Sequence, residues 1–235
     1  MKLAILETDV LRPALRSEYQ GYGRMFQNLF HSAEVTWEMP VFSVIKGDYP
    51  EHLEDYDAFL VTGSQHDAFA DTDWIVRLRD YVVTLFQAGK PILGICFGHQ
   101  LVAHALGGQA GRASVGWGMG IMEYQCAAEP TFIDSAQPVS LLVSHRDQVN
   151  RLPPGAQRLL SNDFCPNAAF YIGDTVLCFQ GHPEFTPDYA RLLLNFRQEE
   201  LEADHLADVL ASYQREHQGE RIARWMKAFL ENPRT

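Results

Sequence analysis

Short apolar runs alternate with segments of helical periodicity through most of this 235-residue chain, and this alternation limits the possible folds more than any other feature. Apolar residues at helical spacing follow several of these runs and continue from residue 187 onward. Strand-like runs are expected near residues 2–6, 35–37, 57–61, 91–95, 120–124, 139–143, 168–172 and 175–179. This alternation predicts a three-layer α/β fold, with helices on both faces of a mostly parallel sheet.

The chain length fits a single domain, which we expect to span residues 1–235. Residues 187–235 are expected to form a helical extension at its C-terminal end. An apolar stripe marks one face of the last predicted helix, at Ile222, Trp225, Met226 and Phe229. Such a stripe is more typical of packing than of a partner surface, so we expect the extension to pack against the rest of the domain.

Composition excludes several classes of function. The chain has 30 acidic and 19 basic residues, a net charge of −11, which argues against binding to nucleic acid. No apolar run approaches the roughly 18 residues that span a bilayer, and the apolar start is too short for a signal peptide. We therefore expect a cytoplasmic protein with no membrane segment. The histidines and cysteines show no metal-ligand spacing, so no metal or cofactor is expected.

The strongest local signal is the segment LGICFGHQ at residues 93–100, which follows a strand-like run and opens a predicted helix. Gly94 and Gly98 flank Cys96 in the glycine-x-nucleophile-x-glycine arrangement of a nucleophile elbow. The glycines leave room for a sharp turn, and the N-terminus of the following helix favours a thiolate. A buried structural cysteine is the plainer alternative, but the pattern favours a reactive Cys96.

A second signal is the segment QGHPE at residues 180–184, which also follows a strand-like run. His182 and Glu184 are two residues apart, so in extended backbone their side chains lean to the same side, and Pro183 disfavours a helix there. In isolation this tripeptide is most simply a surface turn. However, a thiolate nucleophile needs a base, and the base needs an acid to orient it. Because the carboxyl ends of parallel strands meet at one edge of a sheet, His182 and Glu184 are expected to lie near Cys96.

Together, GICFGHQ and QGHPE resemble the motifs of class I glutamine amidotransferases, above all the amidotransferase domains of GMP synthases and their free-standing relatives. The resemblance covers residues 2–185 and implies the flavodoxin-like fold of that family. It implies that Cys96 is the nucleophile, His182 the base and Glu184 its orienting acid. In that family such a triad hydrolyses the side-chain amide of glutamine through a cysteine thioester, and the resemblance implies the same reaction for this chain.

The same resemblance implies roles for residues outside the triad. Backbone N–H groups of an oxyanion hole are implied at the loop of Gly63 and Ser64 and at Phe97, next to the nucleophile. Contacts with the amino-acid end of the substrate are implied for Gln100, Ser144, His145, Arg146 and Asp147.

The chain departs from the family pattern in three places. Gly63-Ser64-Gln65 stands where Gly-Gly-Pro is frequent, and Arg146 stands where glycine is frequent. Its guanidinium either bonds to a carboxylate of glutamine or of a γ-glutamyl peptide, or points to solvent. About 50 residues follow Glu184, too few for a synthetase domain. Ammonia made here is therefore released or passed to a separate ammonia-accepting synthetase.

Three functions stay open on these grounds. The first is release of ammonia from glutamine, and the second is hydrolysis of γ-glutamyl peptides or conjugates through the same thioester. The third is a binding or regulatory protein without catalysis, against which the complete triad argues. A thiol hydrolase of another family with a cysteine elbow is disfavoured, because it leaves residues 180–184 without a role.

Overall fold

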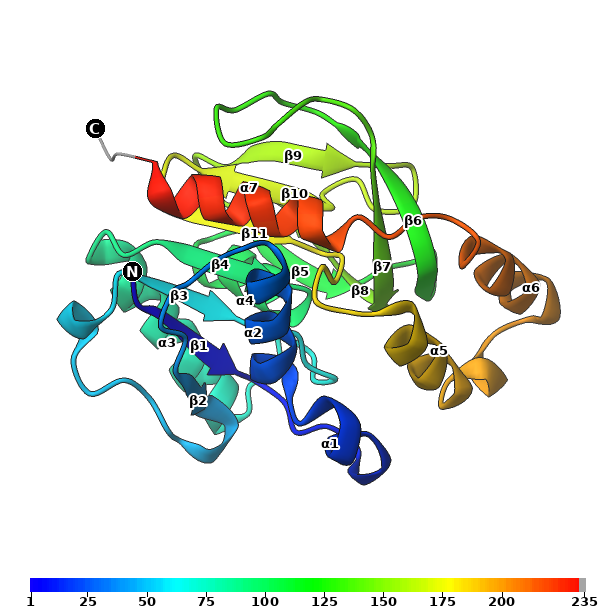
Figure 1. The fold of residues 1–235 in the computed structure, drawn as a ribbon, viewed down its shortest axis with the longest axis horizontal. Coiled ribbons are helices and arrows are strands. Elements are labelled where there is room, and N and C mark those ends of the chain that lie inside the picture. The colour runs from blue at the N-terminus through cyan, green and yellow to red at the C-terminus, as the bar shows by residue number, and fades with distance from the viewer. Residues whose placement is uncertain (233–235) are drawn as a thin grey trace.

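The computed structural model describes residues 1–232, and its centre is a nine-stranded sheet with the order β2-β1-β3-β4-β11-β10-β9-β6-β7 (Figure 1). The first five strands are parallel: β2 (Val41–Ser43), β1 (Leu3–Glu7), β3 (Ala58–Val61), β4 (Ile92–Ile95) and β11 (Val176–Phe179). Every pairing beyond β11 is antiparallel, through β10 (Ala169–Ile172), β9 (Gln157–Ser161), β6 (Gly118–Cys126) and β7 (Val139–His145). A separate antiparallel pair consists of β5 (Gln109–Arg112) and β8 (Asp147–Arg151).

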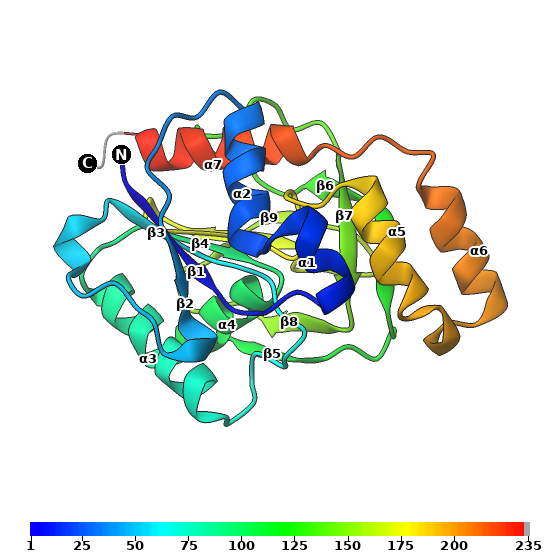
Figure 2. The same cartoon turned by 60° about the horizontal axis from the view of Figure 1, so that its bottom comes forward.

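Helices cover both faces of the sheet, as Figure 2 shows. One face carries α2 (Tyr22–Ser32) and α7 (Gly219–Glu231), and the other carries α3 (Asp73–Gln87) and α4 (Phe97–Ala105). The remaining α-helices lie toward the carboxyl end of β1 and beside β6 and β7: α1 (Pro13–Tyr19), α5 (Pro187–Asn195) and α6 (Ala203–Ser212). Three short 3-10 helices complete the set, at Val44–Lys46, Leu53–Asp55 and Gln198–Glu200. The predicted three-layer α/β fold is confirmed. None of the helices within residues 1–232 combines the length and the apolar composition needed to cross a bilayer.

The last helix, α7, crosses α2 on the same face of the sheet and contacts it. The four residues of its apolar stripe are each at most 4% exposed and belong to the largest buried cluster. The indole N–H of Trp225 also donates a hydrogen bond of 2.8 Å to Asp134. The predicted extension over residues 187–235 includes residues 233–235, which lie outside the described part of the chain.

The strand predicted at residues 35–37 is wrong, because this segment ends α2 instead. Glu34 adopts a left-handed conformation with φ of 58°, and its N–H donates to the carbonyl of His31. The next N–H, of Val35, donates to the carbonyl of Phe30, which completes the hydrogen bonds of a Schellman motif. The buried side chain of Val35 therefore closes a helix end. The strand itself, β2, comes at residues 41–43 and pairs with β1.

Three strands were not predicted from the sequence: β5, β8 and β9. They contain several polar residues, which weakens the alternation by which strands are recognised. β5 and β8 pair with each other outside the main sheet. Their strand conformation therefore depends on this pairing, because their side-chain pattern does not indicate it.

The carboxyl ends of β3, β4 and β11 meet at one edge of the sheet. Val61 pairs with Gly94 across β3 and β4, and Ile95 pairs with Phe179 across β4 and β11. The residues that follow these strands are therefore brought together from distant parts of the sequence. A Cβ atom added at Gly63 would lie 2.8 Å from Cε1 of His182 and 3.7 Å from Cβ of Cys96.

We expect Phe229→Ala to lower the free energy of unfolding by about 3–5 kcal/mol, because it leaves a cavity in the buried cluster under α7. The ring of Phe229 meets Phe132 edge-on, with centroids 5.3 Å apart. Urea unfolding measures the loss. The control is Leu210→Ala on α6, which removes a side chain that is 51% exposed and should change the free energy of unfolding by no more than about 0.5 kcal/mol. Equally small effects of the two changes would contradict a cooperative contribution of α7.

Candidate active site

Cys96 adopts a backbone conformation that is rare outside glycine. It lies between β4 and α4 with φ of 52° and ψ of −101°, and its N–H donates to the carbonyl of Phe179 on β11 at 2.8 Å. The two flanking glycines permit this turn. A Cβ on Gly98 would overlap the Val61 carbonyl, and a Cβ on Gly94 would lie 2.8 Å from the Gly98 oxygen. The segment therefore has the tight strand-to-helix turn expected of a nucleophile elbow.

His182 and Glu184 form a buried pair. Nδ1 of His182 lies 2.7 Å from Oε1 of Glu184, and neither side chain is more than 4% exposed. A carboxylate only accepts hydrogen bonds, so Nδ1 carries the proton and donates it. The other ring nitrogen remains for the sulfur of Cys96, which interacts with the same imidazole. The three residues thus form one connected group.

The surroundings of His182 favour its charged form. Burial on its own lowers the pKa of this histidine, but the nearby Glu184 carboxylate and the Cys96 sulfur outweigh burial and raise the pKa above its ordinary value. The ring of Phe185 stacks on the imidazole with centroids 3.8 Å apart, and Tyr189 packs edge-on against Phe185. The charged form of His182 is therefore favoured beside the sulfur of Cys96, and the Phe185 ring covers one face of the imidazole.

Ser64 and Phe97, whose N–H groups are predicted to form an oxyanion hole, both lie near Cys96: Ser64 lines the same cavity and Phe97 is the next residue. Phe97 is the first residue of α4, so its N–H has no acceptor within the helix. The loop at Ser64 is held from the end of β1, where the Thr8 hydroxyl donates to the Gly63 carbonyl at 2.8 Å. Asp9 accepts a hydrogen bond of 2.8 Å from the N–H of Gln65. Proline cannot make this last bond, so the glutamine at position 65 has a structural role that the family's frequent proline lacks.

A small cavity of about 50 Å³ lies in front of Cys96 and His182, with room for a few water molecules. It is closed by the segment after β1, by the loop at Ser64 and by α5 with the residues after it. Its polar lining outside the triad comes from Asp9, Arg12, Ser64, Gln65, Ser144 and Arg197. Within residues 1–232, no group of three His, Cys, Asp or Glu side chains is placed to hold a metal ion.

Of the five residues predicted to contact the substrate, Ser144 lines this cavity. Three others meet behind it, around one backbone oxygen. Nε2 of Gln100 donates to the Asp147 carbonyl at 2.8 Å and to the side chain of Gln180 at 3.1 Å, and Nδ1 of His145 lies 3.1 Å from the same carbonyl. These side chains brace the start of β8 against the end of β11. Their contact with substrate stays a prediction.

The fifth residue, Arg146, lies beside a second arginine. Both guanidinium groups stand over the Trp117 ring, Arg146 at 5.2 Å and Arg197 at 4.5 Å from its centroid. The cavity in front of Cys96 is lined by Arg197, whereas Arg146 is not among its lining residues within the described chain. Arg197 donates to the Ser144 hydroxyl at 2.5 Å and forms no ion pair with any carboxylate in residues 1–232. Burial lowers the pKa of Arg197.

Sequence reasoning missed three polar residues of the cavity: Asp9, Arg12 and Arg197. A signal existed for Asp9, which follows the first strand and so lies at the edge where functional residues are expected. Arg12 and Arg197 carry no comparable signal, since they lie in helix-flanking segments far from the two motifs.

Comparison with known proteins decides the family. The chain matches the family described as Glutamine amidotransferase class-I over residues 25–198. The chain belongs to this family. The resemblance inferred from the Cys96 and His182 motifs is therefore confirmed. The residues matched by the family include the elbow and the His182 segment. They also include the cavity lining, except for the part contributed by the residues after β1.

Individual relatives agree with this assignment. The chain is 38% identical over 183 residues to Gamma-glutamyl peptidase 3 of Arabidopsis thaliana, which covers 74% of this chain and 73% of that protein. It is 28% identical to the Glutamine amidotransferase-like protein chyE of Penicillium rubens, over 96% of this chain and 97% of that protein. The crystal structure of a glutamine amidotransferase from Thermotoga maritima superposes with a TM-score of 0.77 at 20% identity, covering 98% of this chain and 97% of the other. This last likeness confirms the fold.

We expect iodoacetamide at neutral pH to alkylate Cys96 faster than the other three cysteines. Burial raises the pKa of Cys126, Cys165 and Cys178, whereas the sulfur of Cys96 interacts with the imidazole of His182. Mass spectrometry of peptides after graded reaction measures the order of labelling. His182→Ala should slow labelling of Cys96 by about tenfold or more. Labelling led by Cys126, the half-buried cysteine, would count against a reactive Cys96.

Proposed function

We propose that this chain hydrolyses γ-glutamyl amide bonds through Cys96, and that its substrates are γ-glutamyl peptides or conjugates rather than free glutamine. The observation that carries the proposal is Arg197, an unpaired guanidinium on the cavity of a nucleophile elbow. The likeness to Gamma-glutamyl peptidase 3 supports the same substrate class.

The proposed chemistry is thioester formation followed by hydrolysis. The Cys96 thiolate attacks the γ-carbonyl carbon, a C–S bond forms, and the N–H groups of Ser64 and Phe97 stabilise the oxyanion, at about 2.7–4 kcal/mol per donor. The imidazolium of His182 then gives its proton to the leaving nitrogen as the C–N bond breaks. Neutral His182 next takes a proton from water, which attacks the thioester and releases glutamate. Glu184 keeps the imidazole oriented throughout.

Two arginines and one aspartate, Asp9, are among the residues that line the cavity, and the two arginines favour a substrate with two carboxylates. Arg12 and Arg197 both line the cavity, and a γ-glutamyl dipeptide has an α-carboxylate on its glutamyl residue and another at its C-terminus. Free glutamine has one.

Release of ammonia from free glutamine, for use by a separate synthetase, is the second candidate. The same thioester serves both reactions, so the two are separated by substrate preference alone. We would incubate the protein with glutamine, with γ-glutamyl dipeptides and with the same dipeptides amidated at the C-terminus, and measure free glutamate and ammonia. The proposal requires kcat/KM for the dipeptides to exceed that for glutamine by about tenfold or more, and amidation to reduce it. A preference for glutamine overturns it in favour of the second candidate.

Substitutions of Cys96, His182 and Glu184 should all reduce turnover, though not equally. We expect Cys96→Ser and His182→Ala each to lower kcat by about a thousandfold or more, and Glu184→Gln by less, because the base then remains but is badly oriented. The assay is glutamate release from a γ-glutamyl dipeptide. Cys126→Ser, which changes a half-buried cysteine away from the cavity, is the control and should keep wild-type turnover. Normal kcat in Cys96→Ser would refute the nucleophile assignment.

The two arginines on Trp117 provide a matched pair. Arg197→Gln should raise KM for γ-glutamyl dipeptides by about tenfold or more, because a charge-assisted hydrogen bond contributes roughly 1.5–3 kcal/mol. Arg146→Gln removes a guanidinium from the same ring without changing the cavity lining, so its KM should stay within about twofold of wild type. Steady-state kinetics decide between them. A larger effect at Arg146 would restore the contact first predicted from the sequence.

A further inference from the structure

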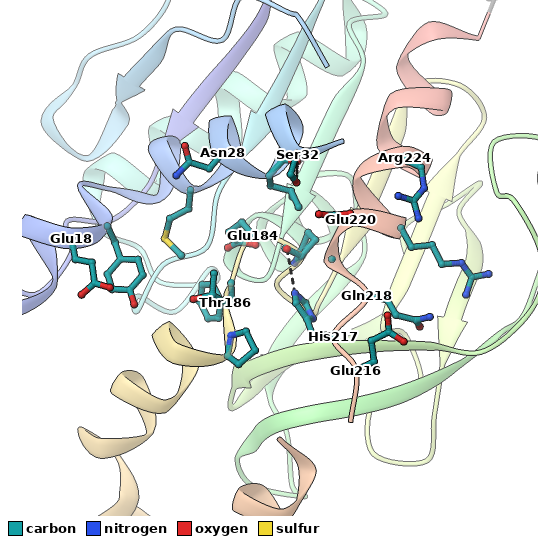
Figure 3. A pocket seen from close by; sticks show the side chains of 18 residues that line it. Glu18, Asn28, Ser32, Glu184, Thr186, Glu216, His217, Gln218, Glu220 and Arg224 are labelled. Carbon is teal, nitrogen blue, oxygen red and sulfur yellow. Dashed lines mark hydrogen bonds between the residues drawn. The ribbon is translucent and has the colours of Figure 1, made fainter. Parts of the chain in front are cut away.

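A second, larger hollow reaches the His182 segment from another direction. This groove of about 660 Å³ lies between α2 and the start of α7, and its lining includes Pro183 and Glu184 (Figure 3). His217, in the link between α6 and α7, forms part of the wall, and the dashed line in Figure 3 marks its interaction with the carbonyl of Pro183. The residue lies outside the stretch 25–198 that matches the family.

The imidazole of His217 bridges two backbone groups. The N–H of Leu142 on β7 donates to Nδ1 at 3.2 Å, and Nε2 lies 3.3 Å from the Pro183 carbonyl oxygen. An amide N–H only donates and a carbonyl only accepts, so one neutral tautomer, with its proton on Nε2, satisfies both. Burial lowers the pKa of His217 to about 4, which agrees with a neutral ring at neutral pH.

The His217 bridge is one of two links between Leu142 and the segment that contains His182. The carbonyl of Leu142 accepts a hydrogen bond of 2.8 Å from the N–H of His182. Leu142 therefore holds His182 directly through its carbonyl and holds Pro183 through its N–H and the His217 ring. Pro183 is the residue between the predicted base and its orienting acid, so two consecutive residues of that segment, His182 and Pro183, are held by one residue of β7.

The N–H and carbonyl of Leu142 can make these contacts because β7 lies at the edge of the sheet. β7 is the last strand in the sheet order, so its outward N–H and carbonyl groups have no strand partner. Gln218 occupies the preceding edge position: its backbone N–H donates to the Ser140 carbonyl, and its side-chain oxygen accepts from the Ser140 N–H, both at 2.9 Å. Gln218 thus anchors the same link to β7 through hydrogen bonds to Ser140.

Gly219 independently shows that the start of α7 lies close to Pro183. A Cβ at this position would overlap the Pro183 carbonyl oxygen and would lie 2.6 Å from Nε2 of His217. The start of α7 therefore packs so tightly on the His182 segment that a side chain at position 219 would displace the His217 contact.

We propose that His217 is a positioning residue, which sets the orientation of His182 and Glu184 toward Cys96 by tying Pro183 to Leu142. The inference rests on the proposed function for its effect on turnover, but its effect on the thiol of Cys96 does not depend on any substrate. It makes the start of α7 a working part of the active site.

The test compares variants of His217 in the full chain. His217→Ala should lower kcat for a γ-glutamyl dipeptide by about 10- to 100-fold, as a misplacement near 1 Å does, with KM within about twofold of wild type. It should also slow alkylation of Cys96 by iodoacetamide about tenfold. His217→Gln keeps a donor that reaches Pro183 and should recover at least about a third of the wild-type kcat. A role in stability alone would lower the unfolding midpoint without changing either rate in the folded protein.

Gln218→Ala is the matched control, because it loosens the same link on the same strand but leaves the Pro183 contact intact. Its kcat and alkylation rate should match the wild type. Equal losses in Gln218→Ala and His217→Ala, or unchanged rates in a folded His217→Ala, overturn the proposal.

If His217→Ala does not fold, His217→Gln and Gly219→Ala decide: the proposal requires kcat to fall in Gly219→Ala and to survive in His217→Gln. If the wild type cleaves no γ-glutamyl compound, the proposed function fails, and the alkylation rates still test His217.

Discussion

The close packing of β3, β4 and β11 at their carboxyl ends is the constraint on which the rest of the structure depends. Gly63, Gly94 and Gly98 stand where a Cβ would meet His182, the elbow backbone or β3. Only this lack of side chains lets Cys96 turn sharply into α4 with its N–H bonded to β11. The strain of that turn is held because the three strands are buried on both faces and cannot move apart without exposing their apolar side chains.

The C-terminal helices line the candidate site as well as packing against the sheet. The side chains of α5 and of Arg197 close the cavity in front of Cys96, while the link before α7 contacts the opposite side of the His182 segment. The apolar stripe of α7 anchors that link to the sheet, since its four residues are buried against the core. The proposed role of His217 would couple the packing of α7 to the geometry of the His182–Glu184 pair.

Charge acts locally in this protein. A net charge of −11 repels anionic molecules at long range, yet the cavity itself is lined by Arg12 and Arg197. Screening at physiological ionic strength limits the general repulsion to about 8 Å. The half-buried guanidinium of Arg197 pairs with no carboxylate in residues 1–232 and acts within a few ångströms in a medium of lower dielectric, which is the basis of its proposed role in binding substrate.

The sequence by itself determined the features that depend on neighbours in the chain: the α/β alternation, the elbow at Cys96 and the pairing of His182 with Glu184, two residues apart. Tertiary structure decided what depends on distant partners. Val35 closes a helix rather than forming a strand, and polar β5 and β8 are ordered by pairing with each other. Likewise Arg197 and His217 acquire their positions only when helices after the family motifs fold back onto the sheet. No local pattern encodes that return, because the contacts that hold it join residues more than 30 positions apart.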